Sequence, residues 1–354
     1  MRKGILLVNL GTPISPSVNN VRKYLAEFLM DPRVITLHRF LRFLLVRCII
    51  VPFRAAKSAR LYRKIWDSQT GSPLLHYSNM QRQLLKMELG RGYVVELAMR
   101  YQYPSIELAL NKLKTAGVES IRVIPMFPQY ASATSGSVIA KVMETMNKWD
   151  VIPSVSFVNS FHDDEFMIEA FAENGRKYPA ENYDHVLFSF HGLPEAQLIQ
   201  CDASGSHCQR KKGCCDTLTS VNFNCYAAQA HHTARLIAIR LGILPGNYTV
   251  CFQSRLGRAE WIKPYTADVI ANLAQTGYKR LLVFCPAFVA DCLETIYEIG
   301  VEYREMFLTA GGQHLQLVES LNGSPIFIKA LQNMASQKAP VLEHHGVKRL
   351  CLSH

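Results

Sequence analysis

The chain has 354 residues, of which 49% are hydrophobic and 19% charged, which is typical of a globular protein with two hydrophobic cores. Its 39 basic and 28 acidic residues give a net charge of +11, which favours acidic partners such as phosphates, carboxylates or an anionic membrane surface. The basic residues are scattered, and no nucleic-acid-binding signature is present, so we expect no nucleic-acid partner.

The N-terminal apolar run, residues 5–10, ends at Gly11 and is too short for a secretory signal, so we expect a cytosolic protein. The most apolar region, residues 40–53, contains Arg42 and Arg47 and is too short to span a membrane. Its apolar residues recur at helical spacing, as in a helix that lies on a membrane surface. They are Leu37, Phe40, Leu41, Leu44, Leu45, Cys48 and Ile49. A helix packed on the core, or the wall of an apolar pocket, is an equally good interpretation.

Apolar runs rich in β-branched residues alternate with helical patterns along the chain, which predicts parallel sheets covered by helices on both faces. The predicted strands cover residues 4–10, 93–99, 120–126, 154–158, 185–190, 248–252, 280–286 and 315–318. The clearest helical patterns cover residues 105–116, 136–147, 164–176 and 227–241. The predicted class is therefore α/β, doubly wound and duplicated. We expect domains at residues 1–150 and 151–325, followed by a helix and tail at 326–354.

The first predicted strand is followed by Asn9-Leu10-Gly11-Thr12-Pro13 and not by a glycine-rich phosphate loop. A nucleotide site of the usual kind is therefore not expected. The fifth strand instead leads into His191-Gly192-Leu193-Pro194, which places an imidazole at the carboxyl end of a buried strand. Ligands of open parallel sheets bind at that edge, and histidine transfers protons near neutral pH. The simpler alternative is a turn histidine bonded to the backbone.

Three carboxylates, Glu294, Glu298 and Glu302, recur at every fourth residue, so a helix would stack them along one face. Like charges at this spacing repel one another unless a cation offsets them, and a divalent metal ion passing along the face would do so. The alternative is a solvated acidic face. The segment follows another predicted strand, as His191 does, which favours a functional role.

Half of the ten cysteines lie at residues 201–225, which we call the cysteine-rich segment. In a cytosolic chain such clustering indicates metal or cluster ligation before disulfides. The irregular spacing of Cys208, Cys214, Cys215 and Cys225 suits a [2Fe–2S] cluster better than a zinc site, with Cys201 as a reserve ligand. Reduced free thiols are the alternative.

Eight motifs occur in order between about residues 3 and 333, and together the chain resembles the ferrochelatases. They are Leu7-Val8-Asn9-Leu10-Gly11-Thr12-Pro13, Asp31-Pro32-Arg33-Val34-Ile35, Gly71-Ser72-Pro73-Leu74, Met99-Arg100-Tyr101, Pro128-Gln129-Tyr130-Ala131-Ser132-Ala133-Thr134, Ser189-Phe190-His191-Gly192-Leu193-Pro194, Phe252-Gln253-Ser254-Arg255 and Glu294-Thr295-Ile296-Tyr297-Glu298. The resemblance implies two Rossmann-like domains around a porphyrin cleft. It also implies insertion of ferrous iron, a substrate, into protoporphyrin IX to make protohaem.

The resemblance assigns His191 as the proton acceptor and Glu294 as its partner, both also metal ligands, with Glu298 and Glu302 continuing a polar path for iron. It also implies a set of porphyrin-pocket residues: Arg100, Tyr101, Gln129, Tyr130, Ser132, Thr134 and Trp261. Residues 37–53 become a hydrophobic lip, where porphyrin enters and where the protein contacts a membrane, so we expect a protein peripheral to the inner membrane. The expected assembly is a monomer or a homodimer.

Two departures from the family pattern affect these expectations. Cys292 stands where some relatives have a histidine, which argues against a scheme with two histidine ligands. The cysteine-rich segment replaces a shorter loop and resembles that of bacterial ferrochelatases with an internal cluster. The tail after Gln337 has a single cysteine, Cys351, so it cannot supply several cluster ligands. Two other functions stay open: a chelatase for another tetrapyrrole such as coproporphyrin III, and a non-enzymatic iron–sulfur or haem-sensing protein.

Overall fold

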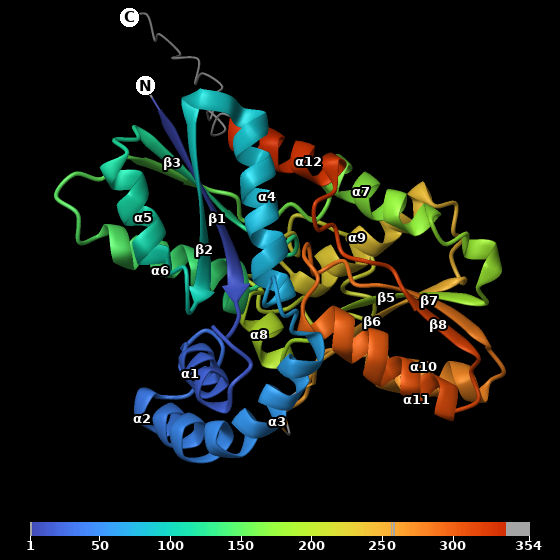
Figure 1. Cartoon of the computed structure of the whole chain (residues 1–354). Helices are drawn as coiled ribbons and strands as arrows, with labels where there is room; N and C mark the ends of the chain where they lie inside the picture. The colour runs from blue at the N-terminus through green and yellow to red at the C-terminus, as the bar shows by residue number, and fades with distance from the viewer. Residues whose placement is uncertain (1, 256, 258, 338–354) are drawn as a thin grey trace, which may run out of the picture.

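The computed structural model describes residues 2–255, 257 and 259–337 of the chain. These residues contain two four-stranded parallel sheets covered by helices (Figure 1), so the predicted duplicated α/β class is confirmed. The first sheet contains β1 (Lys3–Gly11), β2 (Tyr93–Tyr101), β3 (Ser120–Pro125) and β4 (Ser154–Phe157). The second contains β5 (His185–His191), β6 (Tyr248–Gln253), β7 (Arg280–Phe284) and β8 (His314–Leu317).

Helices connect the strands throughout the described residues. Those before β5 are α1 (Val18–Leu29), α2 (Arg39–Phe43), η1 (Leu44–Ile50), α3 (Val51–Ile65), α4 (Pro73–Leu89), η2 (Gly90–Gly92), α5 (Ile106–Thr115), η3 (Ser132–Gly136), α6 (Ser137–Met146), α7 (Glu165–Arg176) and η4 (Ala180–Asn182). Those after β5 are α8 (Glu195–Gln200), α9 (Tyr226–Arg240), α10 (Thr266–Gln275), η5 (Leu293–Tyr303), α11 (Arg304–Thr309) and α12 (Pro325–Ser336). Of these, η1, η3 and η5 are π-helices, whose hydrogen bonds run from residue i to i+5.

The first sheet is buried on both faces, which explains why its strands are continuous apolar runs. In β1, Ile5 and Leu7 face a core that includes Leu85 of α4. The intervening residues, Leu6 and Val8, face a second core formed with α5 and α6. Side chains alternate between the faces because the period of a strand is two residues.

The second sheet is built in the same way and shares one of its cores with the first. Phe188 of β5 lies in the same hydrophobic core as Leu7, together with residues of α7, α9 and α12. Leu187 faces the opposite side, where residues of α10, η5 and α11 cover the sheet. The shared core holds the two sheets together.

The last helix, α12, packs against both α7 and α4 and so lies between the two sheets (Figure 1). The domain limits at residues 150 and 325 therefore stay a prediction. The tail at 338–354, with Cys351, lies outside the described residues.

Strand order determines where a ligand of this fold binds. The orders are β2-β1-β3-β4 and β6-β5-β7-β8, so the direction of winding reverses between β1 and β3, and between β5 and β7. Ligands of doubly wound sheets bind beyond the carboxyl ends of the strands at such a reversal. In the second sheet, His191 ends β5, and the segment that leads to η5 follows β7. The two predicted catalytic segments therefore flank the same reversal point.

Candidate active site

His191 is the last residue of β5, which extends one residue beyond the predicted strand. It is in register with Gln253 at the end of β6. Its Nδ1 lies 2.7 Å from the carbonyl oxygen of Gly192. Because a carbonyl oxygen only accepts, Nδ1 carries the proton, and the lone pair of the neutral ring is on Nε2. The backbone-bonded histidine of the simpler interpretation is thus present, and this same bond makes Nε2 a proton acceptor.

Aromatic rings border the imidazole of His191. The ring centroids of Trp261 and Phe288 each lie 6.4 Å from it. The hydroxyl of Tyr226 donates to the His191 carbonyl oxygen at 2.8 Å, which fixes the backbone at the strand end. A Cβ atom on Gly192 would lie 2.8 Å from the Gln253 carbonyl oxygen and 3.1 Å from the Trp261 ring. Glycine therefore lets this loop pass close to β6.

The three acidic residues lie on η5, a π-helix where the sequence predicts an α-helix. Glu294 and Glu298 are partly buried and Glu302 is exposed, so the carboxylates lead from the interior of the molecule to its surface. π-Helical turns are rare in proteins, and many of those that occur lie at functional sites. The interpretation as a solvated acidic face holds for Glu302 alone.

Glu298 is held by hydrogen bonds from three residues. Its Oε1 accepts from the backbone N–H of Ser254 at 2.9 Å and from the hydroxyl of Tyr303 at 3.0 Å. Its Oε2 accepts from the hydroxyl of Ser254 and from Nε2 of Gln253 at 3.2 Å. Burial, and next the negative charge of Glu298, raise the pKa of Tyr303. The hydroxyl of Tyr303 therefore stays a donor to this carboxylate.

Gln253, which is 1% exposed, connects β5 to η5 through its side-chain amide. Its Oε1 accepts from the Ser189 hydroxyl at 2.8 Å, and its Nε2 donates to the Glu294 carbonyl oxygen at 3.0 Å as well as to Glu298. Sequence reasoning assigned no role to Gln253, Ser254 or Tyr303. The position of Gln253 at the carboxyl end of a predicted strand was the available signal.

Glu294 lies where the second half of the molecule meets helices of the first. Burial, and next the negative charge of Glu294, raise the pKa of Tyr24 in α1. Burial, Tyr24 and then Glu294 raise the pKa of Tyr62 in α3. Burial and Glu294 also raise the pKa of the Cys292 thiol. The thiol therefore stays protonated and is a poor metal ligand.

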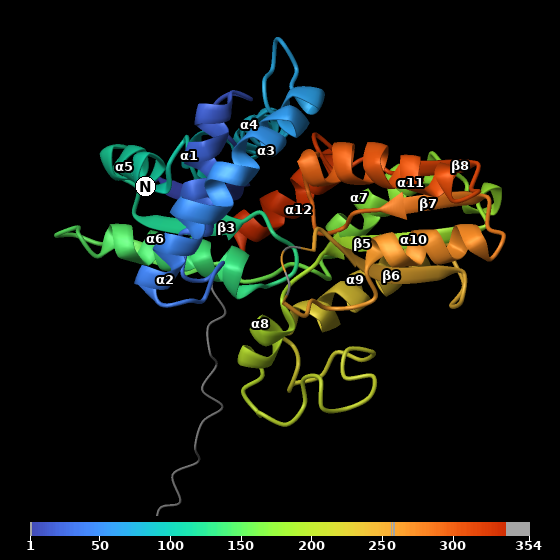
Figure 2. The same cartoon turned by 90° about the horizontal axis from the view of Figure 1, so that it is seen from below.

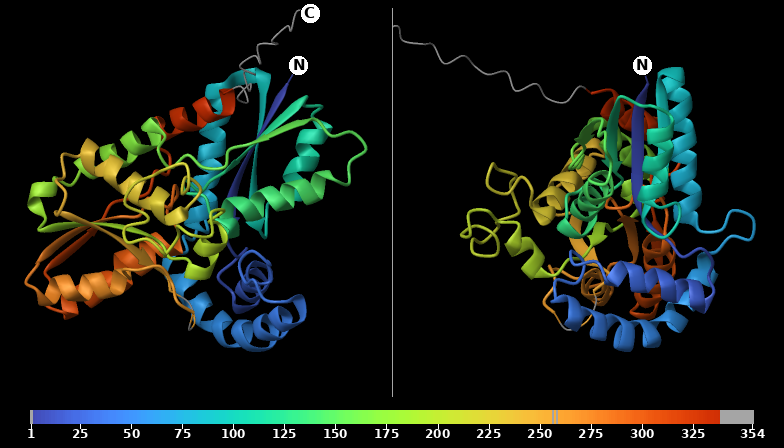
Figure 3. Two further views of the ribbon diagram at one scale, coloured as in Figure 1. Left: turned by 180° about the vertical axis from the view of Figure 1, so that it is seen from behind. Right: turned by 90° about the vertical axis from the view of Figure 1, so that its left-hand side faces the viewer.

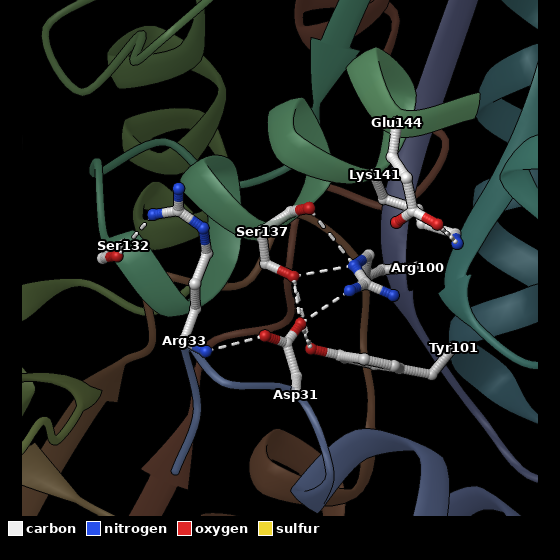
Figure 4. Close-up of polar contacts among 8 residues, drawn as sticks. All are labelled: Asp31, Arg33, Arg100, Tyr101, Ser132, Ser137, Lys141 and Glu144. Atoms are coloured by element: carbon white, nitrogen blue, oxygen red, sulfur yellow. Dashed lines mark hydrogen bonds and ion pairs between the residues drawn. The ribbon is translucent and has the colours of Figure 1, made fainter. Parts of the chain in front are cut away.

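Two predicted porphyrin-pocket residues, Arg100 and Tyr101, form a buried network around Asp31 (Figure 4). Asp31 Oδ2 accepts from the Arg100 guanidinium at 2.6 Å and from the Tyr101 hydroxyl at 2.8 Å, and also from the Ser137 hydroxyl. The side chains of Asp31 and Arg100 are 2% and 15% exposed. Burial, and next the charge of Asp31, raise the pKa of Tyr101. A surface cavity of about 580 Å³, lined in part by Arg100 and Asp31, opens beside the network.

The other predicted pocket residues lie on the segment after β3 and on the loop after β6. Ser132 accepts from the Arg33 guanidinium at 2.9 Å (Figure 4), and the Thr134 hydroxyl donates to a backbone carbonyl of its own turn. Gln129 is buried and donates to Thr233 of α9 at 3.1 Å. The backbone N–H of Tyr130 donates to Gln229 of α9 at 2.7 Å. Gln129 and Tyr130 therefore join the first sheet to a helix of the second.

The cysteine-rich segment forms an irregular loop between α8 and α9 that projects from the body of the molecule (Figure 2). The sulfur atoms of Cys214 and Cys215 are 3.6 Å apart. A hydrogen bond from the Cys215 thiol, with backbone N–H groups at the start of α9, lowers the pKa of Cys225 to about 6. Burial, and then Cys225 and Cys214, raise the pKa of Cys208 to about 12. Cys208 thus interacts with Cys214 and Cys225, and Cys215 interacts with the same two residues.

Cys201 also lies near this group. Burial, and next the charge of Cys225, raise the pKa of its thiol. Its part as the reserve ligand stays a prediction.

The hydrophobic lip, residues 37–53, includes α2 and η1 and lies with α1 and α3 at one end of the molecule (Figure 3). Val46 and Val51 anchor it in a small core with α1. Phe40 and Phe53 are 62% and 80% exposed, and Leu37, Leu41, Phe43, Leu44 and Ile49 are exposed as well. The segment is therefore packed on a small core on one side and exposes a row of apolar side chains on the other. Among the described residues, we find no helix of the length and apolar character needed to span a membrane.

Comparisons with known proteins show the family to which the chain belongs. A sequence model of the ferrochelatase family matches residues 2–339. The chain is 44% identical over 338 residues to the ferrochelatase of Pseudomonas fluorescens strain Pf0-1, which covers 95% of this chain and 98% of that protein.

Two further ferrochelatases are similar over comparable lengths. That of Coxiella burnetii strain Dugway 5J108-111 is 42% identical over 334 residues, 94% of this chain and 93% of its own. That of Legionella pneumophila strain Lens is 41% identical over 345 residues, 96% of this chain and 100% of its own. Matches of this identity and coverage show that the chain belongs to the ferrochelatase family.

Proposed function

We propose that the protein inserts ferrous iron into protoporphyrin IX to form protohaem, the last step of haem biosynthesis. The observation that carries this proposal is His191, whose Nδ1 is bound to the backbone so that Nε2 presents a lone pair at the β5–β7 reversal point. Family membership supports the same reaction.

Metallation exchanges two pyrrole protons for one divalent cation, so the site must accept protons and deliver iron. Nε2 of His191 accepts one pyrrole proton, and we assign the second to the carboxylate of its partner Glu294. Glu294, Glu298 and Glu302 lead from the partly buried site to the surface, and carboxylate oxygens bind a divalent cation weakly enough to release it. Gln253 and Ser254 hold Glu298 in a fixed orientation, which sets the inner end of the path.

Porphyrin binding is assigned to Arg100, Tyr101, Gln129, Tyr130, Ser132, Thr134 and Trp261. The Trp261 ring beside His191 supports stacking of the macrocycle over the proton acceptor. Because Asp31 pairs with Arg100, the guanidinium is pre-oriented for an anionic propionate.

The reaction is tested by mixing the purified protein with protoporphyrin IX and ferrous iron without oxygen and following the absorption spectrum. We expect catalysed conversion to the haem spectrum, with slower turnover of coproporphyrin III. Faster turnover of coproporphyrin III would assign the protein to the other tetrapyrrole. Porphyrin binding without metallation would favour the sensor interpretation and contradict the proposal.

We further propose that Cys208, Cys214, Cys215 and Cys225 hold a [2Fe–2S] cluster. Among the described residues, no three of these sulfur atoms lie close enough together to enclose a single ion. A cluster divides its four thiolates between two iron atoms, which suits this wider spacing. When bound, the group supplies redox chemistry that iron insertion does not need. We therefore assign it a structural or redox-sensing role.

Cys208→Ser is expected to remove the visible charge-transfer absorption of the cluster. It should also lower the melting temperature by several degrees, because the cluster loses one of the ligands through which it stabilises the loop. Iron and sulfide analysis and thermal unfolding measure the two effects. Cys48→Ser, which changes an exposed cysteine of the lip, is the control and leaves both unchanged. Unchanged cluster content and stability in Cys208→Ser would show that the assignment is wrong.

We also propose that the hydrophobic lip binds a membrane surface as part of a cytosolic protein, so that an apolar porphyrin enters from the bilayer. The exposed phenylalanines and the net charge of +11 support attraction to an anionic surface.

Phe40→Ser combined with Phe53→Ser is expected to reduce binding to anionic vesicles by about 10²-fold or more, because each phenylalanine that enters the membrane contributes about 1.5–3 kcal/mol. Liposome flotation measures the bound fraction. The matched control changes two exposed apolar residues away from the lip, Ile239→Ser with Leu244→Ser. Equal flotation of both double variants, or no flotation of the unchanged protein, would rule out the lip as the membrane contact.

A further inference from the structure

A second group of metal-binding side chains lies outside the candidate active site. His162 and Asp163 lie on the loop between β4 and α7, and His232 lies on α9. One potential ligand atom from each of the three lies within 4.8 Å of the other two. His162 is buried, His232 is partly buried and Asp163 is exposed, so the group opens to solvent on one side.

The two imidazoles already have the spacing of metal ligands. Nε2 of His162 and Nδ1 of His232 share a hydrogen bond of 3.2 Å, which an ion would replace. The ring centroids are 5.3 Å apart, with an angle of 54° between the planes. Two nitrogens bound to one tetrahedral metal ion at about 2.0–2.1 Å are roughly 3.3 Å apart. An ion can therefore bind between these atoms with little movement of the rings.

The remaining nitrogen of His162 supplies an independent indication of a ligand. Nδ1 is buried and makes no hydrogen bond within the part of the chain that the structure describes, and the residue is only 6% exposed. The nearest carboxylate oxygen, Oδ1 of Asp163, lies 3.8 Å away. A cation between the two imidazoles would draw the exposed Asp163 carboxylate inward as its third ligand.

The surrounding structure holds the ligands in place. The Thr233 hydroxyl donates to the His162 carbonyl oxygen at 2.7 Å, which ties the loop to α9. Asp164 accepts from two backbone N–H groups at the start of α7, and the N–H of Phe161 donates to the Pro128 carbonyl oxygen.

We propose that His162, His232 and Asp163 bind a divalent transition-metal ion of the Zn²⁺ or Fe²⁺ type, separate from the iron path on η5. Two imidazoles and one carboxylate suit such ions better than Mg²⁺ or Ca²⁺, which prefer ligand sets made of oxygen atoms. The loop that bears His162 follows the first sheet, and α9 packs on the second. The ion therefore cross-links the two halves next to Gln129, which also bonds to Thr233.

Metal binding by the full-length protein, stripped with a chelator, tests this site. Co²⁺ serves as the probe because its visible d–d bands report imidazole and carboxylate ligands, and Zn²⁺ is titrated in parallel by calorimetry. His232→Gln removes one ligand. Asp163→Asn changes a largely exposed residue that the fold does not need. His314→Gln, at a partly buried histidine elsewhere, is the control.

We expect the unchanged protein and His314→Gln to bind one equivalent of metal more than His232→Gln, and Asp163→Asn to bind this equivalent at least tenfold more weakly. Zn²⁺ should also raise the melting temperature less in His232→Gln. Equal stoichiometry and affinity in all four proteins would overturn the proposal. The result does not depend on iron insertion, because metallation of porphyrin by His232→Gln is measured separately and is expected to persist.

Discussion

His191→Ala is expected to lower the rate of iron insertion into protoporphyrin by about 10²- to 10⁴-fold, the usual range for removal of a positioned base. The variant loses Nε2, the proton acceptor at the reversal point between β5 and β7. The residue is only partly buried, and its backbone remains held by Tyr226 and by pairing with β6. We therefore expect the fold to survive.

The initial rate without oxygen measures this effect, and quenching of porphyrin fluorescence measures binding separately. His314→Ala, which removes a histidine at the start of β8, serves as the control and keeps the full rate. Porphyrin binding by His191→Ala should stay within a few-fold of the unchanged protein. A rate within tenfold of the unchanged protein would show that another group accepts the proton.

Asp31→Ala is expected to lower the free energy of unfolding by about 3–5 kcal/mol, the usual cost of removing one partner of a buried ion pair. The carboxylate accepts hydrogen bonds from Arg100, Tyr101 and Ser137, and from the backbone N–H of Arg33 (Figure 4). Its removal leaves a guanidinium without its counter-charge and two hydroxyls without an acceptor. Because Arg100 loses its orientation, we also expect weaker porphyrin binding.

Urea unfolding followed by circular dichroism measures the loss of stability. The same region provides a matched control: Glu144 pairs with Lys141 at 3.0 Å, but the Glu144 side chain is 59% exposed (Figure 4). Glu144→Ala should change stability by less than about 1 kcal/mol, as is usual for surface pairs. Similar losses in both variants would mean that the Asp31 network does not stabilise the fold.

The eight strands could be predicted from the sequence because parallel strands covered on both faces are short, continuous apolar runs. The residues of β1 show this, since Leu6 and Leu7 face different cores and both are buried. Strand ends were less predictable. β7 ends at Phe284 and not at Pro286, where the proline has no N–H to donate to a neighbouring strand.

The π-helical form of η5 could not be predicted from the sequence. The spacing of Glu294, Glu298 and Glu302 is compatible with either kind of helix, and side-chain spacing does not report whether the backbone bonds to i+4 or to i+5. The exposure of the lip was equally undetermined. A helical apolar pattern has the same form whether its face is buried or open to solvent.

The sequence by itself determined the fold class, the family and the position of His191 at a strand end, because these follow from local apolar runs and from motifs in order. Only the tertiary structure decided which partners complete the site. Gln253 bonds to Glu294 and Glu298, and Asp31 to Arg100, across some 40 to 70 positions of the sequence. His162 meets His232 across 70 positions. Such contacts arise when distant segments pack together, and no local pattern of residues encodes them.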